Sequence, residues 1–252
     1  MRALLLGAGN MGRAIGAALV ARGDSVVATL GREAARTDVM ELRPVDVVFE
    51  FTHAEAVVAN ARVAAGAGAR VLVTGTSGWA ADLAIRDELA AIAAASDMRV
   101  VAGATFSVAT VLFSGIAVEA ARRFGRFPDF DAYVFEHHRR TKPDRPSGTA
   151  LAIAEQMLPH LPSKRRARLP EGQGAPDPET LEVVAIRAGA SPGMHVVGFD
   201  APGESIELRV TARDRSAYVA GALLAADTAL ADPELPPGLI TFADLLDRAT
   251  TD

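Results

Sequence analysis

Short apolar runs and longer, Ala-rich stretches alternate along the first part of the chain. The short runs are rich in Val and Leu, which is typical of parallel strands buried on both faces. The Ala-rich stretches contain charged residues at intervals and predict helices. We expect strands at Ala3–Leu6, Ser25–Thr29, Val45–Phe51, Arg70–Thr74 and Arg99–Ala102, and helices at Met11–Arg22, Ala54–Ala65 and Ala80–Ala95. This order predicts a doubly wound parallel sheet.

The pattern changes after Phe106. A long helix is predicted from about Ser107 to Phe124, and a second helix ends near Leu158. Between and after them lie strand-like runs, separated by turn sequences such as A-G-A-S-P-G and A-P-G-E. These strands are expected at Asp131–Glu136, Glu182–Arg187, Gly193–Asp200 and Glu204–Ala212. The second part therefore predicts a mixed sheet with helices on one face.

Composition excludes several classes of function. The chain has 252 residues, of which 50% are hydrophobic, so it can bury a substantial core. Its net charge of -5 argues against nucleic acid as a partner. Without cysteine it has no disulfide, thiolate metal site or cysteine nucleophile. No apolar run approaches the roughly 20 residues of a membrane span, and no signal peptide is apparent, so we expect a cytoplasmic protein without membrane contact.

A glycine-rich loop follows the first predicted strand. The sequence Gly7-Ala8-Gly9-Asn10-Met11-Gly12 fits G-x-G-x-x-G between a strand and a helix. In this pattern the first glycine permits a tight turn, the second lets the backbone approach a pyrophosphate, and the third lets helix and strand pack closely. We interpret the loop as a dinucleotide-binding site, and a merely structural turn is the alternative.

The end of the second strand bears on the choice of cofactor. An acidic residue there binds the ribose of NADH, whereas a basic residue accepts the 2′-phosphate of NADPH. The chain offers Gly31 and Arg32 before Glu33. Arg32 favours NADPH, and Glu33 leaves NADH open.

The fold class expected from these patterns is α/β. Residues 1–106 are predicted to form a Rossmann-like dinucleotide-binding domain, completed by residues 216–252 with helices at Ala217–Ala231 and Phe242–Arg248. Residues 107–215 are predicted to form an α+β domain with the mixed sheet. The basic cluster of Lys164, Arg165, Arg166 and Arg168 is interpreted as a solvated loop.

The segment from Glu136 to Ala150 reads E-H-H-R-R-T-K-P-D-R-P-S-G-T-A. His138 and Lys142 can both carry and release protons. The following Pro-Ser-Gly-Thr begins an apolar helical run, so backbone N–H groups at the helix start would face a carboxylate. The alternative is a solvated strand end. No His/Asp/Glu cluster has metal-binding spacing, and His195 is expected to order a strand or a subunit contact.

Five motifs follow one another along nearly the whole chain. The most specific is E-x-H-x-x-x-K-x-D-x-P-S-G-T-A, from Glu136 to Ala150. The others are E-F-T at Glu50–Thr52, G-T-S-G at Gly75–Gly78, F-S-V at Phe106–Val108 and R-x-G-x-x-x-G-x-H at Arg187–His195. In these motifs and their order the chain resembles the bacterial dihydrodipicolinate reductases, also called 4-hydroxy-tetrahydrodipicolinate reductases, of lysine and diaminopimelate biosynthesis.

The resemblance implies an oxidoreductase that uses NAD(P)H to reduce 4-hydroxy-tetrahydrodipicolinate, a small cyclic imine with two carboxylates. It implies that His138 is the proton donor and Lys142 the catalytic lysine. Substrate-binding positions are expected at Arg139, Ser147, Gly148 and Thr149. Cofactor-binding positions are expected at Gly7, Ala8, Gly9, Asn10, Met11, Gly12, Arg32, Phe51, Gly75, Thr76, Ser77, Gly103, Ala104, Thr105 and Phe106. The family also forms homotetramers through the sheet of the substrate-binding domain.

Some positions depart from the family pattern. The family has two adjacent histidines that begin at the catalytic one, whereas Arg139 follows His138 here and His137 precedes it. The chain also differs at Thr105, Ala109 and Thr110, where the family reads N-F-S-V-G-V-N. These departures leave two alternatives, a related reductase for another cyclic imine or keto acid and a non-catalytic NADPH-binding sensor.

Overall fold

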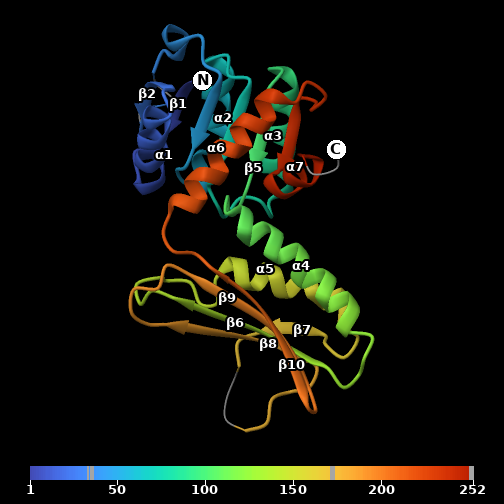
Figure 1. Ribbon diagram of the computed structural model, residues 1–252. Coiled ribbons are helices and arrows are strands. Elements are labelled where there is room, and N and C mark those ends of the chain that lie inside the picture. Colours follow the sequence, from blue (N-terminus) through green and yellow to red (C-terminus); the bar gives the residue numbers. More distant parts are fainter. Residues whose placement is uncertain (33, 35–36, 171–173, 250–252) are drawn as a thin grey trace. The chain divides into compact units, whose positions relative to one another are not determined.

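The computed structural model describes residues 1–32, 34, 37–170 and 174–249, which form two units (Figure 1). Unit 1 comprises Met1–Ser107 and Arg215–Asp252, and unit 2 comprises Val108–Asp214. Each unit contains its own sheet and hydrophobic core. No helix within the described ranges is both long and apolar enough to cross a membrane.

Unit 1 is built on a six-stranded sheet in which every pair of neighbouring strands is parallel. The strand order is β11-β5-β4-β3-β1-β2. The strands are β1 (Arg2–Leu6), β2 (Ser25–Leu30), β3 (Val47–Glu50), β4 (Val71–Thr74), β5 (Arg99–Ala102) and β11 (Gly238–Thr241). Strands β3 and β4 are buried along their whole length, as the unbroken apolar runs predicted.

Helices cover both faces of this sheet. They are α1 (Asn10–Ala21), α2 (Val57–Gly66), α3 (Leu83–Ala95), α6 (Ser216–Ala231) and α7 (Phe242–Ala249), with short 3-10 turns η2 (Val39–Leu42) and η3 (Ala54–Ala56). Helices α2 and α3 pack together, and α6 packs on β4 and β5 beside α1 and α7 (Figure 1). The C-terminal segment therefore completes unit 1.

Strand β11 was not predicted from the sequence. It has four residues and follows directly after two prolines, so its local sequence favours a loop. It forms because Gly238–Thr241 adds to the edge of the sheet beside β5. Such a strand depends on a tertiary contact, which local sequence patterns do not report.

Unit 2 contains a five-stranded sheet in the order β10-β9-β6-β8-β7. The strands are β6 (Asp131–His138), β7 (Arg166–Arg168), β8 (Thr180–Arg187), β9 (Met194–Ala201) and β10 (Glu204–Thr211). Strand β8 is parallel to β6 and β7, whereas β9 is antiparallel to β6 and β10, so the sheet is mixed as predicted. Helices α4 (Val108–Phe124) and α5 (Gly148–Met157), with η4 (Leu158–His160) after α5, cover one face (Figure 1).

The interpretation of the basic cluster as a solvated loop was wrong in part. Arg166–Arg168 form the edge strand β7, because their backbone pairs with β8. Lys164 is buried, its ammonium donates to the Pro178 carbonyl at 3.0 Å, and it lies 2.5 Å from the Asp131 carboxylate. Charge alone therefore does not reveal that this segment is part of the sheet.

Candidate active site

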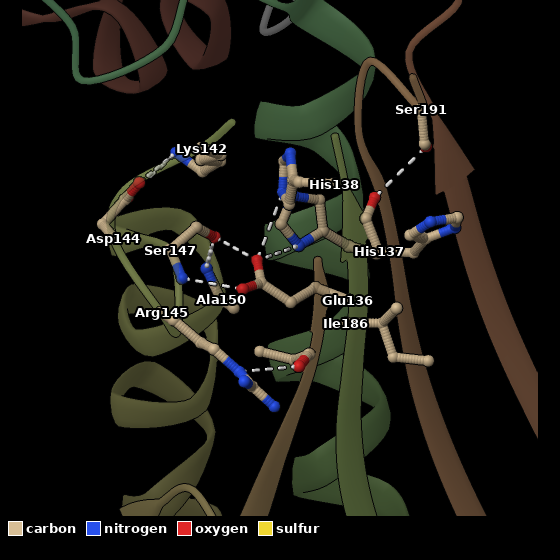
Figure 2. A network of polar contacts seen from close by, with 12 residues as sticks. Glu136, His137, His138, Lys142, Asp144, Arg145, Ser147, Ala150, Ile186 and Ser191 are labelled. Carbon is tan, nitrogen blue, oxygen red and sulfur yellow. Dashed lines mark hydrogen bonds and ion pairs between the residues drawn. The ribbon is translucent and has the colours of Figure 1, made fainter. Parts of the chain in front are cut away.

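Strand β6 extends two residues further than expected and carries His137 and His138 on opposite faces. Side chains alternate along a strand, so His138 faces the same side as Glu136 while His137 points away (Figure 2). The His137 ring is 3.1 Å from the Ala188 carbonyl oxygen instead. The two histidines, although adjacent in the sequence, therefore lie on opposite faces of the sheet.

The register of unit 2 brings two distant motifs together. Glu136 on β6 lies opposite His195 on β9, and His138 lies opposite Arg187 on β8. The four side chains converge near the start of α5, where Ser147 lies. Three strands and one helix start thus contribute to a single cluster.

Glu136 is the centre of the cluster and is fully buried. One carboxylate oxygen accepts from the Ser147 backbone N–H at 2.8 Å and from the Arg187 guanidinium at 2.7 Å. The other oxygen accepts from the Ser147 hydroxyl and lies 3.2 Å from His138 Nε2 (Figure 2). Burial alone would raise the pKa of Glu136, but the hydrogen bonds from His138, Ser147 and Arg187 outweigh it and hold the pKa far below its usual range. Glu136 is therefore a permanent carboxylate.

His195 is a neutral neighbour of this carboxylate. Its Nδ1 lies 3.8 Å from the Glu136 oxygen that faces His138, and the two imidazole rings meet edge to face with centroids 5.1 Å apart. Burial, followed by the charge of His138, lowers the pKa of His195 to about 4. His195 therefore carries no charge near neutral pH.

Helix α5 begins as the Pro-Ser-Gly-Thr sequence predicted. Ser147 is the N-cap, and its hydroxyl accepts from the Ala150 N–H at 3.2 Å. Because Ser147 also donates both its hydroxyl and its N–H to Glu136, it has no donor left for a substrate. The N–H groups of Gly148 and Thr149 find no acceptor among the described residues, since the first N–H groups of a helix have no partner within it. They are the free donors of this helix start.

Lys142 lies in the loop between β6 and α5. Its ammonium donates to Asp144 at 2.8 Å. Burial would raise the pKa of Asp144, but the hydrogen bond and the charge of Lys142 lower it. Arg139, the residue that departs from the family pattern, is exposed. Of these two cations, Lys142 acts on the cluster through its charge, which opposes protonation of His195.

A metal ion does not fit this cluster well. The ligand-type atoms of Glu136, His138 and His195 lie within 4.8 Å of one another in the described part of the chain, a proximity that sequence spacing does not reveal. However, Arg187 already pairs with Glu136, and Arg187 and Lys142 both oppose positive charge at His195. A divalent cation would add to this repulsion. That this chain has no metal site remains a prediction.

The glycine loop of unit 1 has the shape of a phosphate cradle. Gly7 has a φ of 110°, and a Cβ there would lie 2.3 Å from the Phe51 carbonyl oxygen. A Cβ at Gly12 would lie 1.9 Å from the Gly7 carbonyl oxygen, whereas nothing lies within 4 Å of a Cβ at Gly9. Gly7 and Gly12 are thus required by close packing, and the space beside Gly9 is free for a ligand at the start of α1. The loop fits a dinucleotide pyrophosphate.

The other predicted cofactor positions lie in loops at the carboxyl ends of β3, β4 and β5. A buried carboxylate, Glu50, ties two of these loops together. It accepts from the hydroxyls of Thr74 at 2.7 Å and Thr76 at 3.0 Å, from the Asn60 amide at 3.1 Å, and from the Thr52 hydroxyl. The Thr76 hydroxyl also accepts from the Thr52 N–H at 2.8 Å. The E-F-T and G-T-S-G motifs therefore form one hydrogen-bonded structure.

Aromatic contacts hold the third loop. Phe106, in the predicted cofactor segment Gly103–Phe106, is buried between Phe51 and Phe242, with ring centroids 6.0 Å and 4.9 Å away. The side chains of Phe106 and Thr76 therefore support the loops, while Ser77 and Ala104 are exposed. Arg32 is exposed after β2, and Glu33 lies outside the described residues.

Sequence reasoning missed three side chains of the site. From the sequence, Glu136, Arg187 and His195 were motif positions without an assigned role in the site. His195 was expected to order a strand or a subunit contact. The structure places all three around His138. The signal was present, because Arg187 and His195 are the first and last residues of one motif.

Comparison with known proteins shows to which family the chain belongs. The family model "Dihydrodipicolinate reductase, C-terminus" matches residues 109–246. The 4-hydroxy-tetrahydrodipicolinate reductase of Myxococcus xanthus is 39% identical over 80% of this chain and 72% of its own length. That of Methanococcoides burtonii is 32% identical over 94% and 86%. A dipicolinate-bound dihydrodipicolinate reductase from Paenisporosarcina sp. TG-14 has the same fold, with a TM-score of 0.73 at 18% identity over 96% of this chain and 97% of that one. The chain belongs to the dihydrodipicolinate reductase family, whose members are also named 4-hydroxy-tetrahydrodipicolinate reductases.

Proposed function

We propose that this protein is an oxidoreductase that uses NAD(P)H to reduce 4-hydroxy-tetrahydrodipicolinate to tetrahydrodipicolinate, a step of lysine and diaminopimelate biosynthesis. The observation that carries the proposal is the cluster of unit 2. The chain belongs to this family, and within the Glu136–Ala150 segment His138 ends β6, Lys142 lies in the loop that follows, and α5 begins with free N–H groups. These are the groups that a reduction followed by protonation of a carboxylate-bearing substrate requires.

The substrate carboxylates are assigned to the start of α5. The free N–H groups of Gly148 and Thr149 and the positive end of the helix dipole favour an anion there. Lys142 and Arg139 add positive charge nearby. Ser147 acts through Glu136 and the helix cap rather than by donating to the substrate. The dipicolinate bound to the Paenisporosarcina protein is a cyclic dicarboxylate, which supports this substrate class.

His138 is assigned as the general acid. Loss of water from the substrate gives a conjugated imine, and the nicotinamide supplies a hydride to it when the cofactor is bound. The resulting enamine needs a proton on carbon, which His138 donates and then regains from solvent. Lys142 keeps the site electropositive while negative charge is present on the substrate.

The cofactor is assigned to unit 1. The Gly7–Gly12 loop would hold the pyrophosphate, and the exposed Arg32 favours the 2′-phosphate of NADPH over NADH. The loops that contain Phe51, Gly75–Ser77 and Gly103–Phe106 would hold the nicotinamide half. Arg32→Ala is expected to weaken NADPH binding much more than NADH binding, measured by fluorescence titration of each nucleotide.

One assay tests the reaction. NADPH oxidation is followed at 340 nm with the freshly formed condensation product of pyruvate and aspartate semialdehyde. Turnover with this product supports the proposal. Turnover only with other cyclic imines or keto acids would assign a related reductase, and NADPH binding without any turnover would assign a sensor.

We also propose a cytoplasmic homotetramer built through the sheet of unit 2. The face of this sheet opposite α4 and α5 carries Tyr133, Phe135, Val184 and Ile186, and Ile186 is 42% exposed. Aromatic and aliphatic side chains on an open sheet face favour self-association. Light scattering of Ile186→Asp is expected to show smaller species than the unmodified protein. A monomeric unmodified protein would contradict the tetramer.

A further inference from the structure

One of the two ring nitrogens of His138 lies beside a carboxylate. Nε2 is buried and lies 3.2 Å from a carboxylate oxygen of Glu136. That carboxylate is ionised and is itself held by Arg187 and Ser147. A fixed carboxylate beside one nitrogen favours the form of the ring in which that nitrogen bears a proton. In neutral His138, the proton is therefore expected on Nε2.

Two elements of the R-x-G-x-x-x-G-x-H motif enclose the same ring. The His195 ring meets it edge to face at 5.1 Å. Gly193 has a φ of 152°, and a Cβ there would lie 2.9 Å from Cε1 and 3.1 Å from Nδ1 of His138. A larger residue at Gly193 would displace the imidazole. The motif thus supplies Arg187, which pairs with Glu136, together with Gly193 and the neutral ring of His195, which both lie against His138.

We propose that His195 and Glu136 are positioning residues that hold the His138 ring so that Nδ1 is the nitrogen that protonates the substrate. The proposal rests on the proposed function. In the step, the Nδ1–H bond of the imidazolium breaks as the new C–H bond forms on the enamine carbon. His138 is left neutral with its remaining proton on Nε2, still directed at Glu136, and regains a proton on Nδ1 from solvent.

The neutrality of His195 is essential to this arrangement. The titratable and charged groups around His138 are Glu136 on β6, Arg187 on β8 and His195 on β9. Lys142, which is paired with Asp144 in the loop before α5, acts on His195 through its charge. If His195 were protonated, it would compete with His138 for the same carboxylate oxygen. Burial prevents this, because it lowers the pKa of His195. His138 is therefore the one protonated histidine beside the Glu136 carboxylate in the proposed arrangement.

The tautomer of His138 can be measured without any substrate. Long-range ¹H–¹⁵N spectra of the protein labelled in its histidines distinguish Nε2–H from Nδ1–H, and His138→Gln identifies the signals. At a pH where the ring is neutral, we expect the Nε2–H form. A predominant Nδ1–H form would overturn the proposal. This measurement stays valid even if the condensation product of pyruvate and aspartate semialdehyde is not a substrate, so the two proposals fail separately.

Variants of His195 supply the kinetic test. His195→Leu keeps the bulk of the side chain but removes its polar edge, whereas His195→Asn keeps a polar group near the position of Nδ1. We expect His195→Leu to lower kcat by about 10- to 100-fold with little change in KM or NADPH affinity, because misplacement of an acid affects the chemical step. It should also mix the two tautomers of His138. His195→Asn should restore most of kcat and the pH profile.

A matched control is available in the same unit. His160 lies in η4, beyond the C-terminal end of α5, whereas the cluster lies at its N-terminal end. His160→Leu should leave kcat, its pH profile and the His138 signals unchanged. Normal kcat and an unmixed tautomer in His195→Leu would remove the positioning role. Equal losses of activity and of folded structure in both His195 variants would assign His195 a purely structural role.

Discussion

At the scale of single residues, two buried carboxylates organise the two predicted binding regions in different ways. Glu50 is surrounded by neutral donors from Thr52, Asn60, Thr74 and Thr76. Glu136 is paired with a cation and held by a helix cap. A buried charge needs such partners, because burial without them costs several kcal/mol. Some motif residues, among them Thr52 and Thr76 at Glu50 and Ser147 at Glu136, are therefore hydrogen-bond donors that the burial of a glutamate requires.

The proposed acid and lysine can be tested individually. His138→Gln and Lys142→Ala should each lower kcat by about 100-fold or more, the usual contribution of general acid-base catalysis. His138→Gln keeps a donor near the position of Nε2 but cannot release a proton at neutral pH. Steady-state rates at saturating NADPH provide the measurement, and near-normal kcat in either variant would remove that residue from the chemistry.

Arg139 should act on binding rather than on the chemical step. It is exposed and directly follows His138, the proposed acid, so we expect it to bind a substrate carboxylate without contact to Glu136. Arg139→Ala is expected to raise KM about tenfold, the loss of one charge-assisted contact, with kcat largely unchanged. A comparable exposed arginine, Arg126, lies outside the cluster, and Arg126→Ala should leave both constants unchanged. A decrease in kcat for Arg139→Ala would instead link Arg139 to the acid.

At the scale of elements, the start of α5 connects helix stability with the cluster. The Ser147 hydroxyl caps the helix and donates to Glu136 at the same time. Ser147→Ala should therefore lower the free energy of unfolding by about 2–4 kcal/mol, the sum of a lost cap and a lost hydrogen bond to a buried charge. Urea denaturation measures this change. Ser163→Ala, at an exposed position of the same unit, should stay within about 0.5 kcal/mol.

Most elements could be predicted from the sequence, because their signals are local. Apolar runs identified β1 to β5, and Pro-Ser-Gly-Thr identified the start of α5. Strands β7 and β11 were missed because each is short and forms by pairing at a sheet edge. In the cluster around His138, the sequence predicted site roles for His138 and Ser147 but not for the other members, for a related reason. Glu136 meets His195 through the pairing of β6 with β9, and a register between distant strands cannot be read from spacing.

At the scale of the molecule, each unit builds its predicted site at the carboxyl ends of parallel strands. In unit 1 the motifs follow β1, β3, β4 and β5, and in unit 2 His138 and Arg187 end the parallel pair β6 and β8. Loops that leave this edge are free to vary while the sheet fixes their origin. In both units a buried glutamate at or near the end of a strand thus holds the loops of the predicted site.

The buried His195 should also make the stability of the protein depend on pH. Its pKa is lowered to about 4 in the folded state, while in the unfolded chain it is about 6.5. Between these values the unfolded chain binds a proton that the folded protein does not, so stability is complete above about pH 6.5 and falls as the pH decreases toward 4. The contribution is about 3 kcal/mol, at 1.36 kcal/mol for each pKa unit.

Chemical denaturation at a series of pH values measures this dependence. The lowered pKa of Glu136 and Asp144 acts in a different range, because unfolded carboxyl groups take up protons only below about pH 4.5. The decrease between pH 6.5 and 4.5 therefore belongs to histidine. It should be much smaller in His195→Asn, which cannot bind a proton. His160→Asn, at a partly buried position of the same unit, is the matched control. An equal decrease in His195→Asn and the unmodified protein would show that His195 is not the group responsible.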